Sequence, residues 1–215
     1  MPPKKKLILF DFDGVIADSF SIAFEINKII DPNIITKSDY QKHFDGNIYD
    51  CRKNNTSYGE EEIKRIDEEF FARYIPRMEE VKIFPDMKEV IAKLGKSYIL
   101  IIISSTIRTH IIDFLKRNNI TSYFKEISGS KIVDPNKTER IKMVFEKYGV
   151  KPSDCVFITD TLGDMREANS VGVQSIGVSW GFQDKNNLQK GNPVSIAEKP
   201  EDICLLVSSY FTQNE

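Results

Sequence analysis

The chain has little of what marks secreted, membrane-spanning or nucleic-acid-binding proteins. Its three cysteines lie far apart and form no CxxC pair, so we expect neither a disulfide framework nor a zinc site. No apolar run reaches membrane-spanning length, and the apolar run after the N-terminal lysines is too short for a signal peptide. Lys and Arg number 30 against 32 Asp and Glu, which argues against nucleic acid as the main partner. We therefore expect a cytoplasmic protein without membrane or nucleic-acid partners.

Internal repeats and low-complexity tracts are also missing. The 11 glycines and 9 prolines are moderate numbers, and 40% of the 215 residues are hydrophobic. A chain of this length can bury one core, or one core with a small attached domain. These values exclude a repeat array and a largely disordered chain.

Four short apolar runs have the composition of strands that are buried on both faces. They are Leu7–Phe10, Tyr98–Ile103, Cys155–Thr159 and Val173–Val178. One-sided helical patterns lie just before the second run, at Asp86–Lys96, and between the second and third runs, at Arg108–Asn118 and Thr138–Tyr148. Strands that alternate with helices predict an α/β fold with a parallel sheet and helices on both faces.

The segment between the first two predicted strands is much longer than one crossover requires. From about Asp18 to Val81 it shows amphipathic helical patterns at Phe20–Ile30, Lys37–Phe44 and Glu60–Ile75, and no strand-like run. Because long structureless loops are rare in compact domains, we expect an all-helical insert on the α/β core.

Acidic residues and a serine stand where the predicted strands end. They are Asp11, Asp13, Ser104, Asp160 and Asp164. The carboxyl ends of parallel strands meet at one edge of the sheet, where ligands bind. Carboxylates gathered there would repel one another, so the cluster makes sense around a hard divalent cation, and Mg²⁺ is the natural candidate.

Chemical roles follow from the spacing, although each residue also has a structural interpretation. Of Asp11 and Asp13, one could act as a nucleophile beside the metal while the other exchanges a proton with the leaving group. The Ser104 hydroxyl and the amides after it, beginning at Ser105, could hold a phosphate oxygen. Lys137 precedes a helix, where a cation is unfavourable, which suggests that it faces an anion. The structural alternatives are an acidic turn, helix caps and a surface lysine.

Four spaced motifs together resemble the haloacid dehalogenase superfamily. They are LILFDFDGVIADS, ILIIISST, the region of Lys137 and VFITDTLGDMREANSVGV, and the resemblance extends from Lys6 to about Gly181. The segment SIGVSWGF is most similar to the phosphoglycolate phosphatases of that superfamily. The resemblance implies a Rossmann-like core, formed by residues 1–15 and 82–215, and a helical cap of the C1 type, formed by residues 16–81.

The resemblance also implies a role for each site residue. Asp11 would be the nucleophile and a Mg²⁺ ligand, and Asp160 would bind the same metal. Asp13 would serve as general acid and then base, with its backbone carbonyl on the metal. The chain departs from the family pattern at Thr159, where many relatives carry glycine before the metal-binding aspartate.

Phosphate binding would fall to Ser104 and Ser105. Lys137 would neutralise the nucleophile and the phosphate, and Asp164 would act through water or on Lys137. Lys131 is the alternative lysine, and we prefer Lys137 because of its distance from the end of the helix that follows.

Within the expected cap, the segment HFDGNIYDCRKN resembles the substrate-specificity loop of related caps. Gly46 and Asn47 would lie at this loop, and Arg52 or Lys53 could meet an anionic group of the substrate. Plain surface cations are the alternative interpretation of these last two residues.

The resemblance implies a Mg²⁺-dependent phosphomonoester hydrolase that acts on a small phosphorylated metabolite through an aspartyl-phosphate. Phosphoglycolate is the first candidate substrate, and the protein is expected to be a monomer or homodimer. A phosphomutase of the β-phosphoglucomutase type and a non-catalytic binding protein are the alternatives. The presence of Asp13 favours phosphoryl transfer over dehalogenation.

Overall fold

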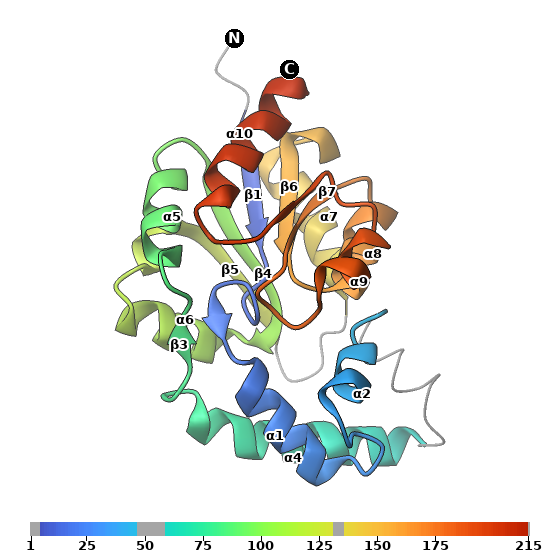
Figure 1. The fold of residues 1–215 in the computed structure, drawn as a ribbon. Helices are drawn as coiled ribbons and strands as arrows, with labels where there is room; N and C mark the ends of the chain where they lie inside the picture. Colours follow the sequence, from blue (N-terminus) through green and yellow to red (C-terminus); the bar gives the residue numbers. More distant parts are fainter. Residues whose placement is uncertain (1–4, 47–58, 131–135, 215) are drawn as a thin grey trace.

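A computed structural model describes residues 5–46, 59–130 and 136–214. Its centre is a six-stranded parallel sheet with the strand order β5-β4-β1-β6-β7-β8 (Figure 1). The strands are β1 Leu7–Phe10, β4 Ile99–Ile107, β5 Phe124–Ser130, β6 Cys155–Thr159, β7 Gln174–Val178 and β8 Ser195–Ala197. The predicted α/β fold with a parallel sheet is confirmed.

Helices cover both faces of this sheet, and β1 shows why. Ile8 and Phe10 lie in the apolar cluster that includes α5, α6 and α10, whereas Leu7 and Leu9 lie in the cluster that includes α7 and α8. Successive residues of a strand point to opposite faces, so an entirely apolar strand needs cover on both sides. The helices of the core are α5 Met87–Leu94, α6 Arg108–Arg117, α7 Lys137–Tyr148, α8 Leu162–Ser170, α9 Lys185–Gln189 and α10 Asp202–Gln213, with short 3₁₀ turns at Thr121–Tyr123 and Pro152–Asp154.

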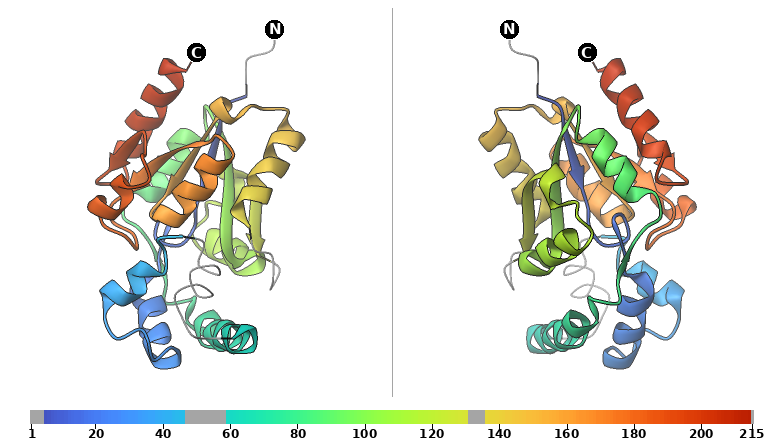
Figure 2. Two further views of the ribbon diagram at one scale, coloured as in Figure 1. Left: turned by 90° about the vertical axis from the view of Figure 1, so that its right-hand side faces the viewer. Right: turned by 90° about the vertical axis from the view of Figure 1, so that its left-hand side faces the viewer.

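The long insert lies at the carboxyl-end edge of the sheet, as the views in Figure 1 and Figure 2 agree. It contributes α1 Phe20–Ile30, α2 Lys37–Lys42 and α4 Glu60–Arg77. Two short strands that the sequence patterns did not indicate lie at the borders of the insert: β2 Ala17–Asp18 pairs antiparallel with β3 Lys82–Ile83 where the chain enters and leaves it. Strands of two residues are too short to produce a periodic pattern.

No helix within the described ranges is both long and apolar enough to cross a membrane.

Candidate active site

The site lies where the three central strands end. β1 is hydrogen-bonded to β4 on one side and to β6 on the other, with Phe10 level with Ile102 and Ile158. The residues that follow these strand positions therefore meet above the middle of the sheet. The structure brings together there every predicted catalytic, phosphate-binding and metal-binding residue, and all of them line one cavity: Asp11, Asp13, Ser104, Ser105, Lys137, Asp160 and Asp164.

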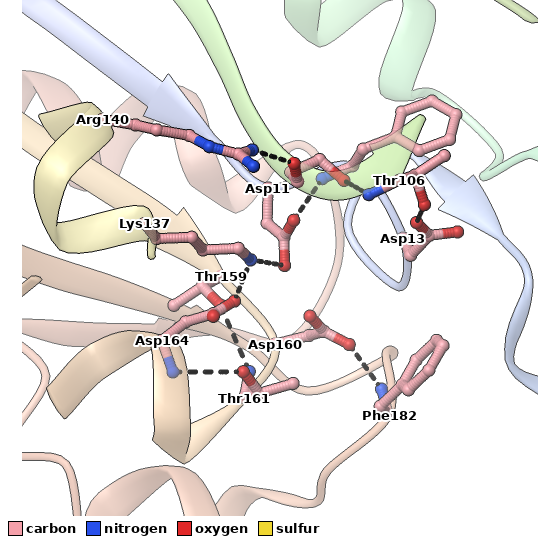
Figure 3. Close-up of polar contacts among 12 residues, drawn as sticks. Asp11, Asp13, Thr106, Lys137, Arg140, Thr159, Asp160, Thr161, Asp164 and Phe182 are labelled. Atoms are coloured by element: carbon pink, nitrogen blue, oxygen red, sulfur yellow. Dashed lines mark hydrogen bonds and ion pairs between the residues drawn. The ribbon is translucent and has the colours of Figure 1, made fainter. Parts of the chain in front are cut away.

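Lys137 bridges two carboxylates (Figure 3). Its Nζ lies 2.9 Å from Oδ2 of Asp11 and 2.6 Å from Oδ2 of Asp164, and all three side chains are buried. Lys137 is the first residue of α7. Asn136 caps this helix, because its side-chain oxygen accepts a hydrogen bond from the amide of Thr138 at 2.8 Å. The sequence position of Lys137 suggested that it faces an anion, and in the structure it faces the carboxylates of Asp11 and Asp164.

Burial and charge act against each other in this group. Burial raises the pKa of Asp11 well above its ordinary value, although Lys137 opposes the shift. Burial would also raise the pKa of Asp164, but the charge of Lys137 and hydrogen bonds to that carboxylate hold it below its usual value. Burial alone would lower the pKa of Lys137, yet Asp11 and Asp164 raise it above the ordinary value. Lys137 therefore stays charged, as a neutraliser of anions must.

Asp160 has an oxygen that the protein does not satisfy. Its Oδ2 accepts a hydrogen bond from the amide of Phe182 at 2.7 Å, while its buried Oδ1 has no partner. Burial, together with nearby Asp164, raises the pKa of Asp160 to about 7. Gly14 and Gly181 both lie against the Asp160 side chain, and a β-carbon at either glycine would overlap it. A buried carboxylate oxygen without a hydrogen-bond donor is unfavourable, and a bound cation would satisfy it.

The donors present suit magnesium. Magnesium is usually bound by one or two carboxylates, with water and substrate oxygens completing its shell. In the described part of the chain, no group of three or more His, Cys, Asp or Glu side chains is arranged to hold a metal ion. Asp11 and Asp160, with the Asp13 carbonyl, are the residues that could hold the ion, which would also favour the ionised form of Asp11.

Asp13 has surroundings quite different from those of Asp11. Its Oδ1 accepts hydrogen bonds from Ser19 Oγ at 2.7 Å and from Tyr74 Oη at 2.8 Å, and its Oδ2 accepts one from Thr106 Oγ1 at 2.5 Å. Burial and the nearby Asp13 charge raise the pKa of Tyr74 well above its ordinary value, so its hydroxyl keeps the proton that it donates. Among the described residues, hydroxyl groups therefore supply the hydrogen bonds to the Asp13 carboxylate, whereas Lys137 contacts Asp11 and Asp164.

Sequence reasoning missed these three hydroxyl residues. Thr106 belongs to the ILIIISST motif and could have been found as the hydroxyl residue two positions after Ser104. Ser19 lies next to α1, and Tyr74 lies on α4 of the insert, 61 positions from the aspartate that it contacts. No local pattern signals a contact that depends on how the insert folds back over the sheet.

Arg140 is a buried cation beside the site that the sequence patterns also did not indicate. It lies one helical turn after Lys137. Its Nη1 donates to the carbonyl oxygens of Ser104 and Ser128. Ser104 Oγ in turn accepts a hydrogen bond from the amide of Thr106 at 3.0 Å. One helix therefore supplies both the charge beside Asp11 and a support for the part of β4 that carries Ser104.

The family departure at Thr159 has a use in the structure. Thr159 Oγ1 donates a hydrogen bond of 2.9 Å to Oδ2 of Asp164, the same oxygen that Lys137 contacts. Glycine at this position could not make that bond.

Predictions for the insert are met only in part. Gly46 lines the cavity, as expected of a residue at a substrate loop. Asn47, Arg52, Lys53 and the alternative lysine, Lys131, lie outside the described residues.

Comparison with known proteins agrees with this geometry. The sequence model of the haloacid dehalogenase-like hydrolases matches residues 8–178. A phosphoglycolate phosphatase of Synechococcus elongatus is 25% identical over 214 residues, which cover 96% of this chain and 99% of the relative. A 5′-nucleotidase of Pseudomonas aeruginosa is 24% identical over 197 residues, with coverages of 86% and 88%.

A solved structure has the same fold. It is a haloacid dehalogenase-like family hydrolase from Streptococcus pneumoniae, with a TM-score of 0.78 at 24% identity, and the match covers 94% of this chain and 97% of that one. The family match spans most of the chain and contains β1 and β6, which end just before Asp11 and Asp160, and β4, which contains Ser104. The chain belongs to the haloacid dehalogenase-like hydrolase family.

Proposed function

We propose that the chain is a Mg²⁺-dependent phosphomonoester hydrolase that acts on a small phosphorylated metabolite through an aspartyl-phosphate on Asp11. One observation carries the proposal. Asp11 and Asp13 are two residues apart, yet the first is paired with a lysine and the second is bound by three hydroxyls. Carboxylates in such different environments suit two different roles, nucleophile and proton carrier. The relatives named phosphoglycolate phosphatase and 5′-nucleotidase support the choice of phosphate esters.

The residues act in two steps. In the first, a carboxylate oxygen of Asp11 attacks phosphorus while Asp13 gives a proton to the departing alcohol oxygen. In the second, Asp13 takes a proton from water, which attacks the phosphorus and releases phosphate and the Asp11 carboxylate. Lys137 balances the negative charge in both steps, and the Ser104 hydroxyl with the amides after it binds phosphoryl oxygens.

Magnesium is part of the proposal. Asp11, Asp160 and the backbone carbonyl of Asp13 would hold the ion, which when bound would neutralise charge on the phosphoryl oxygens. The unpartnered Oδ1 of Asp160 supports this assignment.

The insert has the position of a cap. We infer that residues 16–81 form a C1-type cap over a core made of residues 1–15 and 82–215, and that it excludes water from the first step. Gly46 of this cap lines the cavity, and Tyr74 reaches Asp13. A cytoplasmic setting and a monomeric or homodimeric state belong to the same proposal.

The test is phosphate release by the purified protein, with and without Mg²⁺, from an aryl phosphate, phosphoglycolate, sugar phosphates and nucleotides. Asp11→Asn serves as the control because it removes the nucleophile and keeps the side-chain shape. We expect release that requires Mg²⁺ and disappears in the variant. Release that Asp11→Asn retains would disprove the nucleophile, and isomerisation of a sugar phosphate without release would identify a mutase.

A further inference from the structure

The loop after β7 lies directly against Asp160. The amide of Phe182 donates a hydrogen bond of 2.7 Å to Oδ2 of Asp160 (Figure 3). The amide of Gln183 donates one of 3.3 Å to the backbone carbonyl of the same aspartate, and a β-carbon at Gly181 would overlap its side chain. The bond from Phe182 therefore occupies one oxygen of the carboxylate and leaves the buried Oδ1, the oxygen that we assign to Mg²⁺, for the ion.

Phe182 is held by the insert. Its buried ring belongs to the same apolar cluster as residues of α1 and α2. The centroid of the ring lies 5.1 Å from that of Phe20, 5.0 Å from that of Phe44 and 6.1 Å from that of Tyr40. In addition, Gln41 Nε2 donates a hydrogen bond of 2.7 Å to the carbonyl of Phe182. The insert thus contacts this one residue through its ring and through its backbone.

These contacts connect the insert with a metal-binding side chain. Edge-to-face ring contacts favour one mutual orientation of the two rings, and the orientation of the Phe182 ring restricts that of its own amide. Hydrogen bonds that orient a metal-binding side chain commonly change the affinity for the metal about tenfold or more when they are lost. Contacts made by the insert with Phe182 can therefore act on the ion that Asp160 binds.

We propose that Phe182 is a positioning residue through which the insert orients Asp160 for Mg²⁺, so that docking of the insert and binding of the ion favour each other. This inference rests on the proposed function, because it supposes that Asp160 binds the ion. Coupling of this kind is reciprocal: an insert that raises the affinity for Mg²⁺ is itself held more firmly when Mg²⁺ is bound.

The first test is calorimetric titration of Mg²⁺ into the full-length protein. Phe20→Leu should weaken Mg²⁺ binding about fivefold, because it removes a ring that holds Phe182. The matched control is Phe24→Leu, one turn later on α1, since the ring contacts of Phe24 with described residues are those with Phe20 and Tyr40. Its Mg²⁺ affinity should stay within about twofold of the native value. Equal affinities of the two variants would overturn the inference.

A second variant reaches Phe182 through another bond and removes little packing. Gln41→Leu takes away the donor to the Phe182 carbonyl and keeps the carbonyl of residue 41, which accepts a hydrogen bond from Gln183 Nε2. We expect its Mg²⁺ affinity to fall about threefold. Where Phe20→Leu does not fold, this variant decides the question, and a native affinity in it would contradict the proposed role of Phe182.

The reciprocal effect is measured by amide hydrogen exchange with and without Mg²⁺. We expect Mg²⁺ to slow exchange in α1 and α2 of the native protein, and Phe182→Leu to remove most of that difference. The internal control is α10, which lies away from the insert (Figure 1). Exchange in α1 and α2 that Mg²⁺ leaves unchanged, or slowing of equal size in α10, would overturn the coupling.

Phosphate release from the same samples separates this inference from the proposed function. Mg²⁺-dependent release that requires Asp11, together with native Mg²⁺ affinity in every variant, would support the proposed function and overturn the inference. Affinities in the expected order without hydrolysis of any ester would do the reverse. A native protein that binds no Mg²⁺ would contradict both.

Discussion

Three hydroxyls from three separate parts of the chain meet at Asp13. Ser19 lies beside α1, Tyr74 lies on α4 and Thr106 lies on β4, and between them they occupy both carboxylate oxygens. An aspartate that must give and take a proton needs a fixed orientation toward the leaving group. Tyr74 is the member that the insert supplies, so it links the position of the insert to the proton-transfer group.

At this scale we predict that Tyr74→Phe lowers kcat about tenfold and changes KM little, because it removes one orienting hydrogen bond from Asp13 and keeps the ring. Steady-state kinetics on an aryl phosphate measures both parameters. Tyr148→Phe is the control, since that hydroxyl bonds to Glu126 away from the cavity. A kcat that Tyr74→Phe leaves unchanged would show that Asp13 does not depend on this contact.

Among the elements, α2 is short and depends on its first turn. Thr36 Oγ1 accepts a hydrogen bond from the amide of Asp39 at 3.2 Å, and Asp39 Oδ2 accepts one from the amide of Thr36 at 2.9 Å. This capping box holds the helix that carries Tyr40 to the cavity wall. The hydrogen bonds from Thr36 lower the pKa of Asp39 to about 2.

Thr36→Ala should therefore lower the melting temperature, and the loss should shrink in acid. A carboxylate with a lowered pKa in the folded protein stabilises it above the ordinary value near 3.8, and that contribution is lost as pH falls toward 2. Thermal unfolding at pH 6 and pH 3 compares the native chain with Thr36→Ala and with Thr36→Ser, which keeps the cap. A difference that is the same at both pH values would rule out the contribution of Asp39.

Sequence patterns predicted the elements with strong periodicity and missed those without it. β1, β4, β6 and β7 are apolar runs buried on both faces, and they were found with small errors at their ends. β5 has mostly half-buried residues and a glycine, and β8 has three residues, so neither contains a run that identifies a strand. Edge strands gain their structure from pairing with a neighbour, which composition alone does not report.

For the whole molecule, hydrogen bonds of backbone and side-chain groups fasten the insert to the core. The amide of Gly163 donates to the carbonyl of Phe44 at 2.8 Å, Gln41 Nε2 donates to the carbonyl of Phe182 at 2.7 Å, and Gln183 Nε2 donates to Asp45 Oδ1 at 2.8 Å. These bonds join α2 and the residues after it to the first turn of α8 and to the loop that follows β7. Gly163 is the tightest of these points, because a β-carbon there would overlap the carbonyl of Gly46.

Gly163→Ala should accordingly push the insert away from the core and lower kcat/KM about tenfold or more, since misplacement of a cap costs positioning of the substrate. The matched control is Gly149→Ser, because nothing lies near a β-carbon at that glycine, although its left-handed φ of 63° lowers stability. Kinetics and melting temperatures are measured for both variants. A Gly163→Ala protein with native kcat/KM would show that this approach is not needed for activity.

The site shows the same division between local and long-range information. The positions of Asp11, Asp13, Ser104 and Asp160 at strand ends predict that these residues lie together, because parallel topology forces them to one edge of the sheet. Tyr40 and Tyr74 line the cavity from helices whose positions depend on tertiary packing, and no sequence spacing relates them to the strands. The juxtaposition of the strand-end residues was therefore predictable, and the part of the cavity that the insert lines was not.

The central claim is that Asp11 becomes phosphorylated during turnover, and one measurement tests it directly. The protein is mixed with Mg²⁺ and excess aryl phosphate, quenched, and treated with borohydride, which reduces an acyl phosphate to an alcohol. The account predicts that peptide mass analysis finds homoserine at position 11 and aspartate at position 13. Aspartate at position 11 in a sample that is hydrolysing the ester, or homoserine at another position, would contradict it.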